Sequence, residues 1–383
     1  MFNRDFPQGI AEGDAFLGRV EESARLSDNL QQGRHTLLLS PRRYGKTSLA
    51  RHTIKKRNST YTEIDLFLAI DERSIETRFL NGIEELIQKI YPVPQQWLNR
   101  LVNFFKQANK TWTIGFTGLK LELKPDNHDD IAGNLLLAFK ALEHLLIKKQ
   151  KTTIIFVDEF QEINKIPAGK LIEGSIRHFA QAAKNIVFIF SGSNRHMLVD
   201  IFGDRTRPLY ALCDWLSLAR LTPDLYQKYI NKIAKKTWGE PLSTAVFTEM
   251  ITLTECHPEA TYGLCANLWQ YCRQKNRLPT ADDVQVVWQL HIKEHLKQTR
   301  INLSQYSSGQ LKVLILIAVG FNKILSGKVA QRKLDLTSPS ILSALSVLEN
   351  HDLVEKQADG SYHLIDPVMR DTLINYYSEY LDD

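Results

Sequence analysis

The stretch that most constrains this chain is a short apolar run followed by a tight loop and a helix-forming segment. Thr36–Leu39 reads as a short buried strand, and the loop after it ends in Gly-Lys-Thr-Ser. Strand, loop and helix in this order make a phosphate-binding P-loop, in which backbone N–H groups and a helix N-terminus surround an anion and a lysine adds a positive charge. The residues expected around the phosphates are Ser40, Pro41, Arg42, Arg43, Tyr44, Gly45, Lys46, Thr47 and Ser48.

The loop departs from the usual pattern at its first position. The pattern has glycine there, and this chain has Ser40. The position often relies on the backbone freedom of glycine, although serine is small enough to be tolerated. Gly45, Lys46 and Thr47 are all in place, and the strand before and helix after supply the expected context. The stretch therefore predicts nucleotide binding.

A second motif lies in the middle of the chain. Thr152–Val157 is an apolar run typical of a buried parallel strand, and it ends in the paired acids Asp158 and Glu159, which is the Walker B pattern. We expect Asp158 to hold Mg²⁺ while Thr47 supplies a hydroxyl ligand. Glu159 is expected to orient and deprotonate the attacking water, with Lys46 on the phosphates. The structural alternative, an acidic helix cap, is weaker because a P-loop precedes the motif.

These motifs lie within a wider resemblance. Phe16–Glu22, just upstream of the P-loop strand, resembles the F-x-G-R-x-x-E segment of AAA+ ATPases, specifically the archaeal-type ATPases grouped with the STAND class. Asp366-Pro367 is similar to the ending of the winged domain in that family, so the resemblance runs from Phe16 to about Arg370. It implies an α/β fold, with a P-loop AAA+-type parallel sheet core, a helical lid and a C-terminal winged helix. It also implies ATP as the nucleotide.

In that family, the strand after Walker B ends in a polar residue that meets the γ-phosphate and the attacking water. Ser191, Ser193 and Asn194 follow such a strand here, and their spacing does not choose among them. A turn with a helix-capping side chain is the alternative for each. Arg205 and Arg207 come next, and either could stabilise the transferred phosphoryl group in the same subunit or a neighbouring one. Two solvated surface arginines are the alternative.

The lid of that family carries a G-H/N-P turn before a helix. Here His257 and Pro258 occupy the last two positions, while Cys256 stands where glycine is usual. The resemblance implies that His257 and Pro258 approach the nucleotide from the lid. A helix that simply starts at a proline is an equal alternative.

The rest of the chain predicts the domain organisation. Trp112–Leu123 alternates with glycines at its middle, which favours a β-hairpin inserted into the α/β core. Leu216–Leu221 fits the final core strand. We expect an ATPase core over residues 1–221, a lid over 222–300 and a winged-helix domain over 301–383. In the last domain, Ser338 is expected to cap the third helix.

The third helix of a winged domain is the one that reads DNA. The predicted third helix, which begins at Thr337–Ile341 and has its apolar stripe at Ile341, Leu342, Leu345 and Leu348, contains no arginine or lysine. The basic residues Lys323, Lys328, Arg332 and Lys333 precede it. Because phosphate contacts dominate affinity for DNA, contact with a protein or control of the lid is as well supported as DNA binding.

Composition sets the remaining bounds. A formal charge of +5 permits an acidic partner but does not require one. The four cysteines show no zinc-type pairing, which predicts buried free thiols and a reducing, cytoplasmic location. We expect no membrane-spanning run.

The sequence thus predicts a switch protein that binds ATP, hydrolyses it with Mg²⁺ and couples the bound nucleotide, ATP or ADP, to a partner. That partner is a protein or a second copy of the chain. The alternative is a nucleotide-gated DNA-binding regulator in which hydrolysis is slow or incidental.

Overall fold

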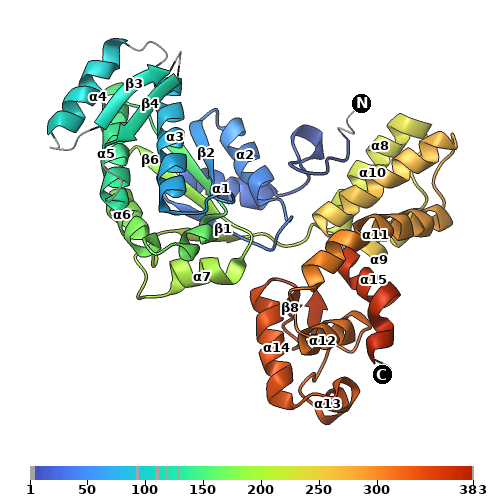
Figure 1. Cartoon of the computed structure of the whole chain (residues 1–383). Helices are drawn as coiled ribbons and strands as arrows, with labels where there is room; N and C mark the ends of the chain where they lie inside the picture. Colours follow the sequence, from blue (N-terminus) through green and yellow to red (C-terminus); the bar gives the residue numbers. More distant parts are fainter. Residues whose placement is uncertain (1–4, 92–94, 108–111, 118–119, 127–129, 382–383) are drawn as a thin grey trace. The chain divides into compact units, whose positions relative to one another are not determined.

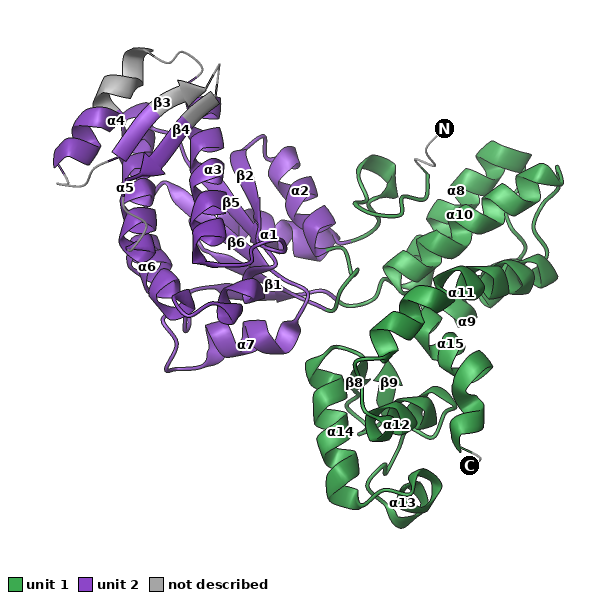
Figure 2. Cartoon of the chain, in the orientation of Figure 1, with its two compact units in different colours: residues 1–18, 41–45, 219–383 green, residues 19–40, 46–218 purple. Residues whose placement is uncertain are grey.

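The computed structural model describes residues 5–91, 95–107, 112–117, 120–126 and 130–381. The chain divides into two compact units, each defined by the contacts among its own residues (Figure 2). Unit 2 comprises residues 19–40 and 46–218, and unit 1 comprises residues 1–18, 41–45 and 219–383. The division into core, lid and winged-helix domains that the sequence suggests stays a prediction.

Unit 2 is built on a five-stranded parallel sheet with the order β2-β5-β6-β1-β7. Residues two apart on a strand face the same side, and both sets are buried here: Ile155 and Val157 join one cluster, while Ile154 and Phe156 are buried as well. Burial on both faces explains why the central strands are uninterrupted apolar runs. The strands are β1 (Thr36–Leu39), β2 (Thr60–Asp65), β5 (Thr153–Asp158), β6 (Ile186–Ser191) and β7 (Asp214–Ser217).

Helices cover this sheet (Figure 1). α5 packs against both α3 and α6, and α1 packs against α2. Phe139 of α5 contacts Phe188 of β6, whose ring stacks on Phe190 at 5.5 Å between centroids. The helices are α1 (Val20–Gln31), α2 (Lys46–Lys56), α3 (Glu72–Ile90), α4 (Gln95–Gln107), α5 (Ile131–Lys149), η2 (Phe160–Lys165), α6 (Gly169–Ala182) and α7 (Arg195–Gly203).

The predicted β-hairpin is confirmed. β3 (Trp112–Thr117) pairs antiparallel with β4 (Lys120–Pro125), and the hairpin packs against α3 and α4 (Figure 1). The residues that join the two strands, 118–119, lie outside the described part of the chain.

One core strand differs from its prediction. The final strand is β7 at Asp214–Ser217, so the predicted range Leu216–Leu221 is displaced towards the C-terminus. The partner strand sets these limits, because Thr36 of β1 pairs with Asp214 and Leu39 pairs with Ser217. Beyond Ser217 the neighbouring strand has ended, and the chain leaves the sheet.

Unit 1 has two hydrophobic clusters. In the first, Trp269 and Trp288 are fully buried together with Phe6, whose ring lies 4.8 Å from that of Trp269. Four helices and a short N-terminal 3-10 turn form this part: η1 (Gly13–Ala15), α8 (Pro223–Trp238), α9 (Thr244–Thr254), α10 (Pro258–Gln274) and α11 (Ala281–Leu303).

The second cluster holds the C-terminal elements, which follow the predicted order of three helices and a hairpin. Thr337, and not Ser338, is the N-cap of the third helix, because its hydroxyl accepts from the Ser340 amide. Pro339 therefore occupies the second helical position. The elements are α12 (Ser308–Ala318), α13 (Lys328–Leu334), α14 (Ser338–Asn350), β8 (Val354–Lys356), β9 (Tyr362–Leu364), α15 (Pro367–Tyr377) and η3 (Ser378–Leu381).

Among the described helices, none combines the length and the apolar character needed to cross a membrane.

Candidate functional site

The candidate site of unit 2 lies where three neighbouring strands end. β1 runs into the P-loop, β5 ends at Asp158 and β6 ends at Ser191. The carboxyl ends of parallel strands meet at one edge of a sheet, and ligands of open α/β sheets bind at that edge. The order β5-β6-β1 therefore brings the residues of both sequence motifs together.

Lys46 is the first residue of α2 and is 7% exposed. Its Nζ donates a hydrogen bond of 2.8 Å to the carbonyl oxygen of Ser40, and so closes the loop on itself. Ser48, in the first turn of the same helix, is also buried. Left-handed backbone occurs at Arg43, with φ of 66°, and Gly45, with φ of 89°, and not at Ser40. Serine is therefore accommodated where the usual pattern has glycine.

The two predicted metal ligands are in contact. Thr47 Oγ1 donates to Asp158 Oδ2 at 2.8 Å, and Ser191 Oγ donates to the other carboxylate oxygen. Burial raises the pKa of Asp158, and the hydrogen bonds from Ser191 and Thr47 act in the opposite direction. A desolvated carboxylate beside a hydroxyl is a set of hard oxygen donors suited to a divalent cation.

Glu159 follows directly in a left-handed conformation with φ of 54°. Its amide donates to Asp158 Oδ1 at 3.0 Å. Its own Oε2 accepts from the hydroxyl of Ser193 at 2.6 Å and from the Ser193 amide at 3.2 Å. A left-handed non-glycine residue is strained and persists only when its surroundings hold it, and such residues cluster at functional sites.

Gln161 is a further member of the site that the sequence did not indicate. Its Nε2 donates to Glu159 Oε2 and, at 3.3 Å, to Ser193 Oγ. The side chain is 2% exposed, and its Oε1 is buried without a hydrogen-bond partner. This Oε1 lies 1.9 Å from the position that a Cβ at Gly192 would take, so the residue at 192 must be glycine for Gln161 to sit here.

The structure gives different contacts to the three polar residues after β6. Ser191 bonds Asp158 and Ser193 bonds Glu159. Asn194 caps α7, because its Oδ1 accepts from the Met197 amide at 3.0 Å. Ser191 and Ser193 therefore lie with the paired acids, while Asn194 has a structural partner.

The two predicted arginines also differ. Arg205 is exposed. Arg207 binds Glu173 of α6 through two nitrogens, and one of these also donates to Asn164 at 2.5 Å. Glu173 is fully buried; its burial raises the pKa of its carboxyl while Arg207 lowers it. Arg207 would have to break this ion pair to reach a phosphate.

The middle of the P-loop, residues 41–45, belongs to unit 1. The ring of Tyr44 meets the ring of His257 edge-on at 5.3 Å, and Arg43 forms a 2.8 Å ion pair with Glu259. His257 is the N-cap of α10, since its Nδ1 accepts from the Ala260 amide at 3.3 Å, and Pro258 is the first helical residue. Burial lowers the pKa of His257 to about 4. Of the remaining loop residues, Pro41 is buried and Arg42 is exposed.

A parallel sheet of this order, with a P-loop after β1 and paired acids after β5, defines the AAA+-type P-loop fold. Solved structures share it over almost the whole chain. A Walker-type ATPase of Pyrococcus abyssi is 18% identical, with a TM-score of 0.67 over 97% of this chain and 99% of that one.

The ORC2 protein of Aeropyrum pernix, in ADPNP-ADP complexes, is 16% identical, with a TM-score of 0.62 over 99% of this chain and 98% of that one. The ADP form of the same protein is 14% identical, with a TM-score of 0.54 over 99% of this chain and 97% of that one. No family model and no curated protein matches the sequence. At these identities the likeness shows the fold alone, an AAA+-type P-loop fold that this chain shares with the Walker-type ATPase and ORC2 structures.

Proposed function

We propose that this protein binds and hydrolyses ATP with Mg²⁺ and acts as a switch that couples its nucleotide state to a partner. The observation that carries the proposal is the 2.8 Å hydrogen bond between Thr47 and Asp158. These residues are far apart in the sequence, they belong to two different motifs, and the sequence predicts them as ligands of one Mg²⁺ ion. Their contact at the carboxyl edge of the sheet supports one shared site.

The P-loop is the segment proposed to bind the phosphates of ATP. In the proposed complex, Lys46 turns from the Ser40 carbonyl to the β- and γ-phosphates, and the loop amides donate to the same oxygens. The positive end of α2 adds to this attraction because the helix begins at Lys46.

The donor set fits Mg²⁺. Thr47 and Asp158 supply one hydroxyl and one carboxylate. No group of three or more His, Cys, Asp or Glu residues able to hold a metal occurs in the described residues. Mg²⁺ usually takes one or two protein oxygens, with phosphates and water completing its shell, so a small set is the expected one. When bound, the ion supplies charge neutralisation at the β- and γ-phosphates.

Glu159 is the residue proposed to activate the attacking water. Ser193 and Gln161 hold one oxygen of its carboxylate, and the second oxygen is available to accept a proton from the attacking water. Arg205, the exposed arginine, is our candidate for stabilising charge on the transferred phosphoryl group. It would act in its own subunit or in a second copy of the chain.

Nucleotide binding is tested with Lys46→Ala against Lys56→Ala, which removes an exposed lysine at the other end of the same helix. A fluorescent ATP analogue should bind the wild type and Lys56→Ala alike, whereas Lys46→Ala should weaken binding more than about tenfold, since it removes a charge-assisted contact. Equal affinity of the two variants would remove the proposed site.

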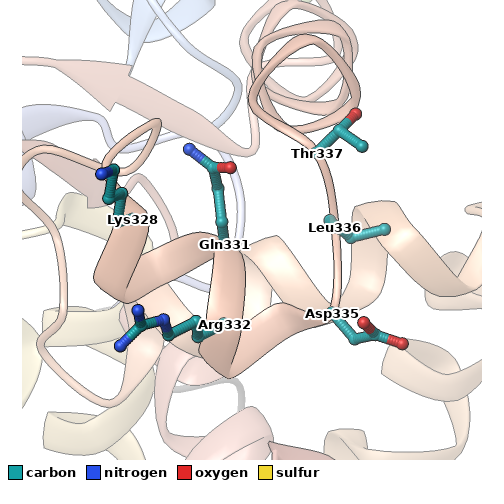
Figure 3. A pocket seen from close by; sticks show the side chains of 6 residues that line it. All are labelled: Lys328, Gln331, Arg332, Asp335, Leu336 and Thr337. Atoms are coloured by element: carbon teal, nitrogen blue, oxygen red, sulfur yellow. The ribbon is translucent and has the colours of Figure 1, made fainter.

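DNA binding is a second candidate function, favoured by one surface of the C-terminal elements. A pocket of about 370 Å³ lies between α13 and the start of α14. Figure 3 shows Lys328 and Arg332 of α13 on its lining, with Asp335 and Thr337 on the segment that leads into α14. Two cations beside the third helix suit phosphate contact, although Asp335 opposes it.

A duplex-binding titration at several salt concentrations, with and without ATP, tests this candidate. If Lys328 and Arg332 contact phosphates, replacing both with Ala should lower the slope of log K against log salt by about 2. An affinity that does not depend on salt would remove DNA as the partner and leave a protein or a second copy.

A further inference from the structure

Within unit 1, a continuous series of polar contacts runs from the P-loop to the last long helix. It begins at Tyr44, which is 5% exposed and whose hydroxyl accepts from Arg220 Nε at 3.2 Å. Tyr44 stands two residues before Lys46. The backbone of Tyr44 is therefore part of the loop whose amides are proposed to bind phosphate.

Arg220 is the centre of the series. One terminal nitrogen donates to Glu255 at both its Oε2, 2.6 Å away, and its carbonyl oxygen, 2.9 Å away. The other donates to the carbonyl of Ile365 at 2.9 Å, just before α15. Only the planar, five-donor guanidinium can serve the tyrosine, the carboxylate and two carbonyls at once, and lysine cannot replace it.

Glu255 also forms an ion pair with a second arginine, Arg370 of α15. Arg370 donates to its Oε1, to the carbonyl of Leu253 at 3.2 Å, and to Asp371 at 2.6 Å. The Glu255 carboxylate is thus shared between Arg220 and Arg370. Bridged charge pairs of this kind are stronger and more directional than neutral hydrogen bonds.

The backbone around Glu255 is strained and requires these ion pairs to hold its conformation. Glu255 and Cys256 both have left-handed conformations, with φ of 48° and 57°, in the turn between α9 and α10. L-residues seldom adopt this conformation even singly, and two in succession require support from their surroundings. The turn leads directly to His257, which packs against Tyr44. The P-loop has its own strained residue beside Tyr44, because Arg43 has φ of 66° and is held by Glu259.

We infer that Glu255 is a positioning residue: by joining Arg220 to Arg370, it fixes the P-loop through Tyr44 and makes nucleotide affinity depend on α15. The inference rests on the proposed function, since it concerns the same nucleotide site. It names a route by which the C-terminal elements and the P-loop affect each other, and the coupling is reciprocal.

The test compares Glu255→Gln and Arg370→Gln with Arg277→Gln. The control breaks a bidentate ion pair with Asp283 in the same unit, away from the series, and so reports general destabilisation of unit 1. For the fluorescent ATP analogue, Glu255→Gln and Arg370→Gln should raise Kd about fivefold or more, the usual lower range of coupled sites. Arg277→Gln should lower Tm and leave Kd unchanged.

A double-mutant cycle adds a readout that a purely structural role would not move. Tyr44→Phe removes the hydroxyl that Arg220 reaches. Glu255→Gln should therefore have less effect on Kd in the Tyr44→Phe protein than in the wild type. Additive effects, or an unchanged Kd in Glu255→Gln, would overturn the inference.

Amide hydrogen exchange of nucleotide-free protein separates this inference from the proposed function. Glu255→Gln and Arg370→Gln should speed exchange in the peptide that contains residues 41–45, and Arg277→Gln should not. If the wild type binds no ATP, the proposed function fails, whereas faster exchange at 41–45 in both variants would still show that Glu255 and Arg370 hold this part of the P-loop. Unchanged exchange at 41–45 in both variants would refute it.

Discussion

Replacing Gly192 with alanine should disrupt the hydrogen bonds that hold Glu159. An added Cβ would lie 1.9 Å from Gln161 Oε1 and 3.0 Å from Gln161 Cδ. Gly192 lies outside the left-handed region, so alanine fits its backbone and the conflict is with Gln161. The glutamine must rotate, and its Nε2 then leaves both Glu159 and Ser193.

The cost can be estimated from the bonds lost. A hydrogen bond to a charged group contributes about 1.5–3 kcal/mol and a long neutral one about 0.5 kcal/mol. Reduced freedom of the unfolded chain returns about 0.4–1 kcal/mol when Gly becomes Ala. The free energy of unfolding should therefore fall by about 1–3 kcal/mol. For a unit of this size, 2 kcal/mol corresponds to a fall in Tm of roughly 4–8 °C.

Scanning calorimetry of a double-mutant cycle provides the assay. Gln161→Ala removes the atoms that the new Cβ would meet, so in that background Gly192→Ala should be neutral or slightly stabilising. Leu198 Cδ1, 3.2 Å from the added carbon, is the tip of a flexible side chain and can move slightly in either background. If Gly192→Ala lowers Tm equally with and without Gln161, the steric argument is refuted.

Other contacts give three further predictions. Arg207→Gln leaves the buried Glu173 unpaired and should cost about 3–5 kcal/mol of stability, whereas Arg205→Gln should be nearly neutral in calorimetry; similar Tm values would contradict this. Burial raises the pKa of Asp158 above its ordinary value, so ionisation of this carboxyl lowers the free energy of unfolding as pH rises through the folded pKa. Asp158→Asn should therefore raise Tm at neutral pH without Mg²⁺, and it should abolish the increase in Tm that Mg-ATP produces in the wild type. A lower Tm of the variant without Mg²⁺ would contradict this prediction. Burial lowers the pKa of His257 to about 4, so the stability that its neutral imidazole contributes is complete above pH 6.5 and is lost as pH falls towards 4. His257→Asn should therefore flatten the decline of Tm between pH 6.5 and 4. An unchanged decline in this variant would contradict the prediction.

The sequence predicted the fold best where burial is complete. β6 is buried throughout and β5 is buried up to its last residue, Asp158, so the composition of both strands identified them. The limits of β7 were misplaced because they depend on the length of β1, a tertiary property that no local pattern contains. The cap of α14 was misplaced by one residue, since Thr337 and Ser338 are both good caps and only the backbone decides between them.

The site was predicted to the extent that its residues belong to motifs. Thr47 and Asp158 were identified from two motifs and are in contact. Ser191, Ser193 and Asn194 lie too close together in the chain for spacing to separate their contacts. Gln161 belongs to no motif, and its only sequence signal is its place two residues after Glu159.

The contacts of Arg220 and Glu255 were not predictable either. These contacts join segments of unit 1 that lie far apart in the sequence. From the sequence alone, each residue is equally well explained as a solvated charge on the surface. Only the folded backbone shows that one guanidinium reaches Tyr44, Glu255 and Ile365 together.

The most direct test of the proposed function is phosphate release from Mg-ATP by the wild type and by Glu159→Gln. Asp65→Asn is the control, because Asp65 is an exposed carboxylate at the end of the neighbouring strand, in register with Asp158. Glu159→Gln should release phosphate about 100-fold more slowly, the usual loss for a general base, and should bind ATP as tightly as the wild type. Asp65→Asn should match the wild type. Equal rates for Glu159→Gln and the wild type would contradict the assignment of Glu159 as the base and, with it, the proposed mechanism.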